Sequence, residues 1–133
     1  MIRHATENDL EPLTRLDCHV SYDELKNILD LRRVILLEDE DGLAGWLRYN
    51  LFWDNTPFMN LLFVLEGKRS QGLGGQLVKF WETEMKRLGY EEVLTSTLSN
   101  EQAQFFYRKH GYVDCGSLLL PGEPLEIILR KSL

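Results

Sequence analysis

The chain has 133 residues, 44% of them hydrophobic and 27% charged, which is ordinary for a soluble protein, and we expect one domain over residues 1–133. The net charge of −6 argues against nucleic acid as a partner, because such a partner needs a basic face. No apolar run reaches the ~18–20 residues of a membrane span, and residues 1–7 lack the apolar region of a signal peptide. Two cysteines, Cys18 and Cys115, are too few for a disulfide scaffold or a Cys-based zinc site. We therefore expect two core thiols, no metal, no membrane partner and a cytoplasmic location.

The first elements in chain order are a short strand and two helices. Residues 2–5 fit a strand. The apolar residues between positions 10 and 16 recur at helical spacing, with Asn8 placed as the N-cap and Glu11 as its capping-box partner. A second short helix is predicted around residues 22–31.

Three strands are predicted next. Residues 34–37 form a short apolar run, and the Asp-Gly pair at 41–42 is a strong signal for a hairpin turn. Residues 43–53 are then the returning strand. After a turn at 54–57, residues 59–65 are nearly all apolar, which predicts a strand buried on both faces.

The second half of the chain changes to a helical period. Apolar residues between positions 72 and 88 line one stripe, which predicts a long amphipathic helix. A strand over 93–97 and a helix over 100–109 follow, and a Pro-Gly turn joins two last strands over 112–120 and 125–131. This order of elements predicts a mixed α/β domain with one central sheet.

A polar, glycine-rich turn separates the apolar strand from the long helix, and residues 69–76 span it. Glycines let a backbone approach a ligand closely, and the first N–H groups of a helix have no partner inside the helix. Such a place binds phosphate, and Lys68 and Arg69 add mobile positive charge to it. The spacing excludes a P-loop, and a Rossmann fingerprint would need glycine where Leu77 stands. From these residues alone, a phosphate site and a turn without a ligand both remain open.

Two motifs in register give the chain a family resemblance. Residues 69–74 resemble the Q/R-x-x-G-x-G/A signature of the GNAT superfamily of N-acetyltransferases. One helix and one strand later, the segment from Asn100 to Tyr112 resembles the family's N-x-x-A-x-x-F-Y-x-x-x-G-F/Y motif, and Arg3 and Ala5 resemble its opening strand. The resemblance covers essentially the whole chain. It implies the GNAT fold, an α/β (α+β) domain with a single central mixed, mostly antiparallel sheet flanked by helices.

The resemblance also implies a cosubstrate, acetyl-CoA, and its site. The backbone of residues 63–65 would pair with the pantetheine arm like an added strand, and an N–H there would polarise the thioester carbonyl. Residues 69–76 would hold the pyrophosphate, Asn100 would hydrogen-bond the pantetheine, and Tyr107 would protonate the departing thiolate. The residues implied in cofactor binding are Phe63, Val64, Leu65, Arg69, Ser70, Gln71, Gly72, Leu73, Gly74, Gly75, Gln76, Asn100, Ala103, Phe106 and Tyr107.

The general base is the point where the sequence departs from the family. Many relatives carry a glutamate nine residues before the signature arginine, and that position is Asn60 here. An amide cannot take a proton at neutral pH. We therefore name Tyr107, Asn60 and Glu66 as catalytic candidates. The open choices for the base are a water held by Asn60, Glu66, Asp54, His19 and Glu24.

These observations together predict an acetyl-CoA-dependent N-acetyltransferase that transfers an acetyl group to a primary amine by direct attack. Two alternatives stay open: a non-catalytic acyl-CoA-binding module, and a protein N-terminal or lysine acetyltransferase. The acceptor, any preference for a longer acyl group, and the choice between monomer and homodimer are not predicted, because fold does not determine function.

Overall fold

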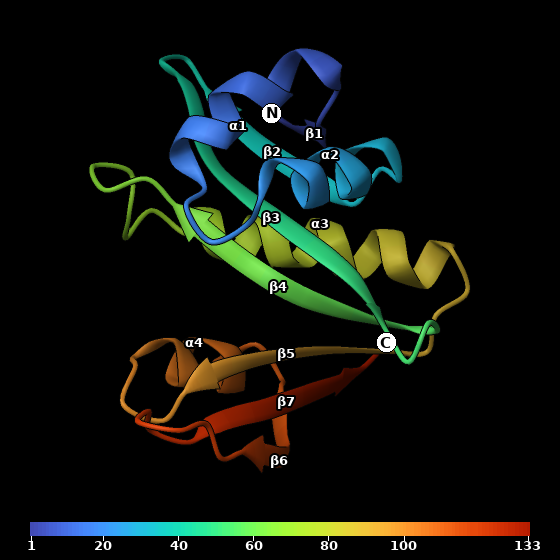
Figure 1. Ribbon diagram of the computed structural model, residues 1–133, viewed down its shortest axis with the longest axis vertical. Coiled ribbons are helices and arrows are strands. Elements are labelled where there is room, and N and C mark those ends of the chain that lie inside the picture. Colours follow the sequence, from blue (N-terminus) through green and yellow to red (C-terminus); the bar gives the residue numbers. More distant parts are fainter. The chain divides into compact units, whose positions relative to one another are not determined.

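The computed structural model describes residues 1–133, and its seven strands form one mixed sheet in the order β1-β2-β3-β4-β5-β7-β6 (Figure 1). The elements in chain order are β1 (Ile2–His4), the 3-10 helix η1 (Glu7–Asp9), α1 (Leu10–Leu16), α2 (Tyr22–Asp30), β2 (Val34–Asp39), β3 (Gly42–Phe52), β4 (Thr56–Val64), α3 (Leu73–Arg87), β5 (Glu92–Leu98), α4 (Ala103–Lys109), β6 (Val113–Leu118) and β7 (Glu126–Ser132). The β4–β5 pair is parallel, whereas β1–β2, β2–β3, β5–β7 and β6–β7 are antiparallel. The predicted fold class is therefore confirmed.

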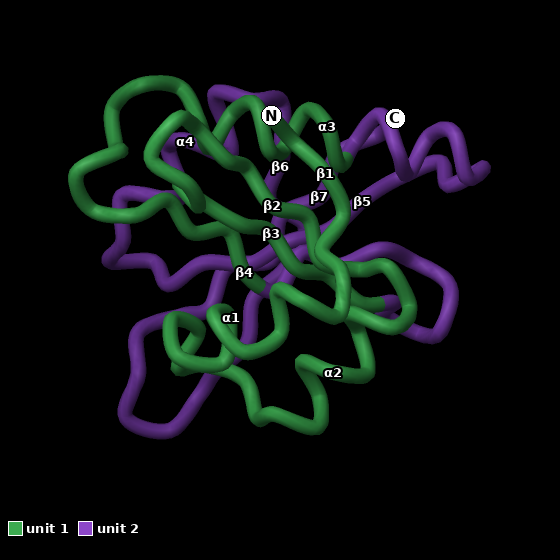
Figure 2. The backbone as a smooth tube through the Cα atoms, turned by 90° about the horizontal axis from the view of Figure 1, so that it is seen from above, with its two compact units in different colours: residues 1–50, 61–81 green, residues 51–60, 82–133 purple.

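The chain divides into two compact units that alternate along the sequence (Figure 2). Unit 1 comprises Met1–Asn50 and Leu61–Trp81, and unit 2 comprises Leu51–Asn60 and Glu82–Leu133. As a result, β3, β4 and α3 each contribute residues to both units.

Unit 1 is built on the antiparallel strands β1, β2 and β3, whose side chains alternate between two faces. On one face, Leu36 and Trp46 are paired across β2 and β3 and pack with leucines of α1 and α2 in one core cluster. On the other face, Tyr49 contacts Trp81 of α3, with ring centroids 5.8 Å apart. Figures 1 and 2 both place α1 and α2 on the side of these strands opposite to the first part of α3.

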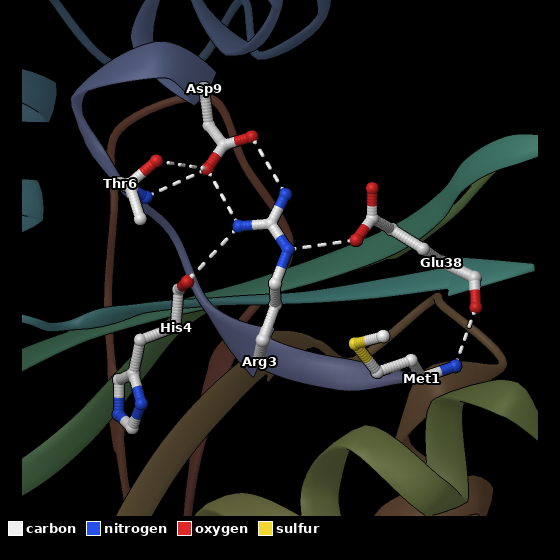
Figure 3. A network of polar contacts seen from close by, with 6 residues as sticks. All are labelled: Met1, Arg3, His4, Thr6, Asp9 and Glu38. Atoms are coloured by element: carbon white, nitrogen blue, oxygen red, sulfur yellow. Dashed lines mark hydrogen bonds and ion pairs between the residues drawn. The ribbon is translucent and has the colours of Figure 1, made fainter.

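A network around Arg3 fixes the beginning of unit 1 (Figure 3). Its guanidinium donates to Asp9 at 2.8 and 3.0 Å and to Glu38 at 2.8 Å. The Asp9 carboxylate also accepts the Thr6 backbone N–H at 2.7 Å. The prediction that Asn8 is the N-cap is therefore wrong. Helical structure already begins at residue 7, and Thr6 is its N-cap, with Asp9 as the capping-box partner.

Unit 2 is centred on the antiparallel pairing of β5 with β7, to which β6 adds an outer strand. Tyr112, 2% exposed, donates its hydroxyl proton to Glu82 at 2.8 Å, and Lys131 donates to the same carboxylate at 2.9 Å. The parallel ladder with β4 links Phe58 to Leu94 and Met59 to Thr95. This ladder places the beginning of β4 beside β5 within unit 2.

Several predicted features differ from the structure. Met59 is buried, but residues 61–65 are only partly buried, so the prediction of a strand buried on both faces is wrong. Leu61, Phe63 and Leu65 still pack against the core cluster of unit 1, so part of this apolar run does serve the core. Cys18 and Cys115 are exposed rather than core thiols, because Cys18 lies in the turn after α1 and Cys115 on the outer strand β6. None of the helices is long and apolar enough to cross a membrane.

Candidate functional site

The turn predicted to bind phosphate is a loop of unit 1 that leads from β4 into α3. The Leu65 N–H donates to the Ala44 carbonyl of β3 at 2.8 Å, and the Lys68 N–H donates to the Leu65 carbonyl at 2.9 Å. The backbone takes the left-handed conformation at Gly67 (φ 52°), Ser70 (φ 65°) and Gly72 (φ 77°). These left-handed residues turn the chain within residues 65–72, which connect the end of β4 to the start of α3.

The start of α3 presents a row of unpaired amides. Its first helical hydrogen bond runs from the Gln76 N–H to the Gly72 carbonyl at 3.1 Å. The N–H groups of Leu73, Gly74 and Gly75 therefore have no partner inside the helix. They point outward at the N-terminal end of α3, where the helix dipole is positive. A Cβ placed on Gly72 would meet no atom within 4 Å, so open space lies in front of this loop. The geometry fits an anion such as a phosphate.

The backbone of Val64 faces away from β3. Because a trans peptide points its C=O and N–H in opposite directions, the Leu65 N–H bond to Ala44 turns the Val64 carbonyl to the other side. In an extended strand the N–H of a residue points the same way as its C=O, so the Val64 N–H also faces away from β3. Of residues 63–65, Val64 thus offers both backbone groups to a chain laid along this edge.

The two cations of the loop are already engaged. Arg69 donates from Nε to the Val64 carbonyl at 3.0 Å, and its guanidinium carbon lies 5.4 Å from the centroid of the Phe63 ring. Lys68 pairs with Asp39 at 2.8 Å and with Asp41 at 2.6 Å. The expectation of mobile positive charge at Lys68 is therefore wrong, because two carboxylates of the β2–β3 turn hold its ammonium.

A glycine that the sequence reasoning missed lets β4 approach β3. A Cβ on Gly45 would lie 2.8 Å from the Phe63 carbonyl oxygen and 3.3 Å from a methyl carbon of Leu77. Any larger residue would push the strand end or α3 away. The signal available in the sequence was a glycine within a strand, which often marks a close approach of two backbones.

Tyr107 on α4 is, like Tyr112, a buried phenol of unit 2, and it is 6% exposed. Burial raises the pKa of Tyr107 to about 12, while a hydrogen bond with Thr95 acts in the opposite direction. The Thr95 hydroxyl donates to the Met59 carbonyl at 3.0 Å. Thr95 thereby connects Tyr107 to β4, a role that was not predicted from the sequence.

Asn100 lies in the turn before α4 rather than inside the helix as predicted, because α4 begins only at Ala103. The Gln104 side chain donates to the carbonyls of Ser99 and Glu101 at 2.8 and 2.9 Å, which holds this turn. Asn100 itself is exposed, while Ala103 is half-buried on α4. Phe106, also half-buried, packs against Tyr107 with ring centroids 5.3 Å apart.

The candidates for the general base are spread over both units. Unit 1 carries Glu66, His19 and Glu24, and unit 2 carries Asn60 and Asp54. All five are exposed, so burial singles out none of them. No three His, Cys, Asp or Glu side chains are grouped so that they could hold a metal ion.

The comparisons with known proteins agree with this arrangement. The sequence model of the acetyltransferase (GNAT) family matches residues 3–112. Among solved structures, the chain is similar to a GNAT-family acetyltransferase from Bacillus cereus ATCC 10987, with 24% identity, a TM-score of 0.80, and coverage of 99% of this chain and 96% of that one. An aminoglycoside 6'-acetyltransferase type Ii shares 22% identity at a TM-score of 0.79, over 99% of this chain and 96% of that one.

A chain of the NatC complex bound to Gag peptide and CoA is 15% identical, with a TM-score of 0.84 over 100% of this chain and 98% of that one. At these identities the likeness to solved structures shows the fold. The family match covers well over half of the sequence. The chain therefore belongs to the acetyltransferase (GNAT) family.

Proposed function

We propose that this chain is an N-acetyltransferase that uses acetyl-CoA to acetylate a primary amine by direct attack. The observation that carries the proposal is the row of unpaired amides at Leu73, Gly74 and Gly75, placed one tight loop after an exposed strand edge at Val64. These amides suit the pyrophosphate of CoA, and the edge suits its extended pantetheine arm. Leu62 and Val64 are also only partly buried and alternate with the residues that pack on the core, so they would give that arm an apolar wall.

The Val64 N–H is the donor we assign to the thioester carbonyl. Residues 63 and 65 cannot take this role, because the Leu65 N–H is already bonded to β3 and strand alternation turns the Phe63 N–H to the same side. A backbone N–H fixed in this way stabilises negative charge that develops on an acyl oxygen. When CoA binds, the hydrogen bond from Arg69 to the Val64 carbonyl would break, so that this carbonyl could accept a hydrogen bond from the pantetheine arm.

Acetyl-CoA would supply an acetyl group already activated as a thioester, so the chain itself needs no nucleophilic side chain. Its task is to position the acceptor, to accept the amine proton and to protonate the thiolate. We assign the last step to Tyr107, whose raised pKa of about 12 keeps its hydroxyl proton at neutral pH. The base remains among Glu66, Asp54, His19, Glu24 and a water held by Asn60.

The acceptor is the open part of the proposal. The similar structures carry names as different as an aminoglycoside acetyltransferase and a complex bound to Gag peptide, and fold does not choose among them. The position at Asn60, an amide where many relatives have glutamate, favours one second candidate: a module that binds acyl-CoA without catalysis.

Thiol release from acetyl-CoA tests the proposal. The purified chain would be mixed with acetyl-CoA and a panel of polyamines, amino acids, aminoglycosides and peptides. We expect at least one amine to raise thiol release well above the rate without enzyme. Tight binding of acetyl-CoA with no release for any amine would instead support the binding module.

A further inference from the structure

Lys68 joins the candidate phosphate loop to the β2–β3 turn of unit 1. Its ammonium lies 2.8 Å from a carboxylate oxygen of Asp39 and 2.6 Å from one of Asp41. The Asp41 N–H donates to Asp39 at 2.8 Å, so the two aspartates form one compact acceptor. In Figure 1 this turn and the loop after β4 lie toward the same side of the unit.

The β2–β3 turn is the most acidic stretch of the chain. Residues 38–41 are Glu-Asp-Glu-Asp, and we call them the acidic turn. Arg3 pairs with Glu38, and Lys68 is the cation that meets Asp39 and Asp41. The hydrogen bonds that the Lys68 ammonium donates to Asp39 and to Asp41 raise the pKa of Lys68, so the ammonium stays charged at any physiological pH.

An acidic turn beside an anion-binding loop is unfavourable unless its charge is cancelled. Gly72 is four positions after Lys68 in the chain, so their Cα atoms are at most about 15 Å apart. The Debye length is about 10 Å at 0.1 M salt and about 30 Å at 0.01 M. At low salt, uncancelled carboxylates at Asp39 and Asp41 would therefore repel a pyrophosphate at the start of α3.

We propose that Lys68 is a positioning residue whose single positive charge offsets part of the negative charge of Asp39 and Asp41, and that the charge left on the acidic turn sets the affinity of the loop for CoA. This inference rests on the proposed function, because it needs the pyrophosphate to bind at the loop. It assigns a role to three residues outside both family motifs. If the same three residues only held the loop in place, their replacement would change CoA affinity in a different direction.

The decisive variant removes the carboxylates and keeps the lysine. Asp39→Asn with Asp41→Asn breaks the ion pairs but leaves Lys68 positive and removes two negative charges. If Lys68 cancels charge, CoA binds this variant more tightly, by about 3- to 10-fold at low salt. If Lys68 only anchors the loop, the same variant binds CoA more weakly. The sign of the change separates the two roles.

Lys68→Met is the complementary variant. We expect CoA affinity to fall by about 3- to 10-fold at low salt, and the loss to shrink toward none at about 0.5 M salt. The triple variant Lys68→Met, Asp39→Asn, Asp41→Asn loses two negative charges and one positive charge, so at low salt it should bind CoA more tightly than Lys68→Met and at least as tightly as the wild type. Lys26→Met is the matched control, because Lys26 also pairs with an aspartate, Asp30 at 3.2 Å, but on α2. It changes the net charge equally and should leave CoA affinity nearly unchanged.

Calorimetric titration of CoA into each variant at both salt concentrations measures these effects, and thermal unfolding confirms that each variant is folded. Weaker binding by the Asp39→Asn, Asp41→Asn variant, or a Lys68→Met loss that is independent of salt, would overturn the inference. Both results leave the proposed function standing, since the wild type still binds CoA. A wild-type chain that fails to bind CoA would overturn the proposed function and this inference with it.

Discussion

A tyrosine can protonate a departing thiolate only while its own hydroxyl keeps its proton. Burial raises the pKa of Tyr107 to about 12, so the hydroxyl stays protonated throughout the neutral range. Tyr107→Phe should lower kcat by about 10²–10⁴, the range for losing a general acid, and leave CoA affinity unchanged. Steady-state kinetics with the best amine of the panel checks this. A wild-type kcat in the variant would reduce Tyr107 to a packing role.

A second residue-level test concerns the buried ion pair of unit 1. The Asp17 side chain is 0% exposed and accepts from Arg48 Nε at 2.7 Å and from Trp46 Nε1 at 3.1 Å. Asp17→Ala would leave the Arg48 guanidinium buried without its partner, which destabilises a protein by about 3–5 kcal/mol. Urea unfolding measures the loss. The control is Glu11→Ala, which breaks an exposed pair with Arg15 and should cost at most about 1 kcal/mol. Equal losses in the two variants would contradict this.

The same aspartate predicts a dependence of stability on pH. Burial acts to raise the pKa of Asp17, but the hydrogen bonds from Arg48 and Trp46 outweigh it and lower the pKa below its ordinary value. The folded state therefore binds this proton less tightly than the unfolded state. The stabilisation is complete above the unfolded pKa of about 3.9 and is lost as the pH falls through the folded one. Asp17→Asn should be less stable at pH 7 and lose less on acidification, and an unchanged slope would contradict this.

At the scale of elements, the passage from β4 to α3 rests on glycines in left-handed backbone. Gly72 has φ 77° and Gly67 has φ 52°, and a Cβ on either would meet open space. Alanine at either position should therefore cost about 1–2 kcal/mol from backbone strain alone. Only Gly72 precedes the unpaired amides of α3, so Gly72→Ala should also weaken CoA binding, by at least about 10-fold if the amides hold the phosphates. Equal CoA affinity in the two alanine variants would show that the phosphates bind elsewhere.

Helices with a regular apolar period could be predicted from the sequence, whereas the polar side-chain contacts that end turns and join distant residues could not. The apolar stripe over residues 72–88 predicted a helix, and α3 covers Leu73–Arg87 because one face of it is buried. The start of α4 was misplaced by three residues, since local contacts such as those of Gln104 decide where the turn ends. The pairing of Lys68 with Asp39 joins residues far apart in sequence. No local sequence pattern predicts this ion pair.

At the scale of the whole molecule, the order of elements and two spaced motifs were enough to predict the fold and the family. Both follow from patterns that any chain of this family must repeat: a strand, a glycine-rich turn and a helix. The burial of individual strands was harder to predict. An apolar run such as residues 59–65 predicts an apolar contact but does not say whether protein or ligand provides it. The acceptor lies beyond such patterns altogether.

Calorimetric titration of CoA into the wild-type chain, together with thermal unfolding in the presence of CoA, is the decisive test of the assigned phosphate site. If the amides of Leu73, Gly74 and Gly75 hold the pyrophosphate, CoA should bind saturably to the folded chain. It should also raise Tm, because a ligand at about 100 times its Kd stabilises the native state by about 2.7 kcal/mol. Millimolar CoA that releases no heat and leaves Tm unchanged would contradict the account.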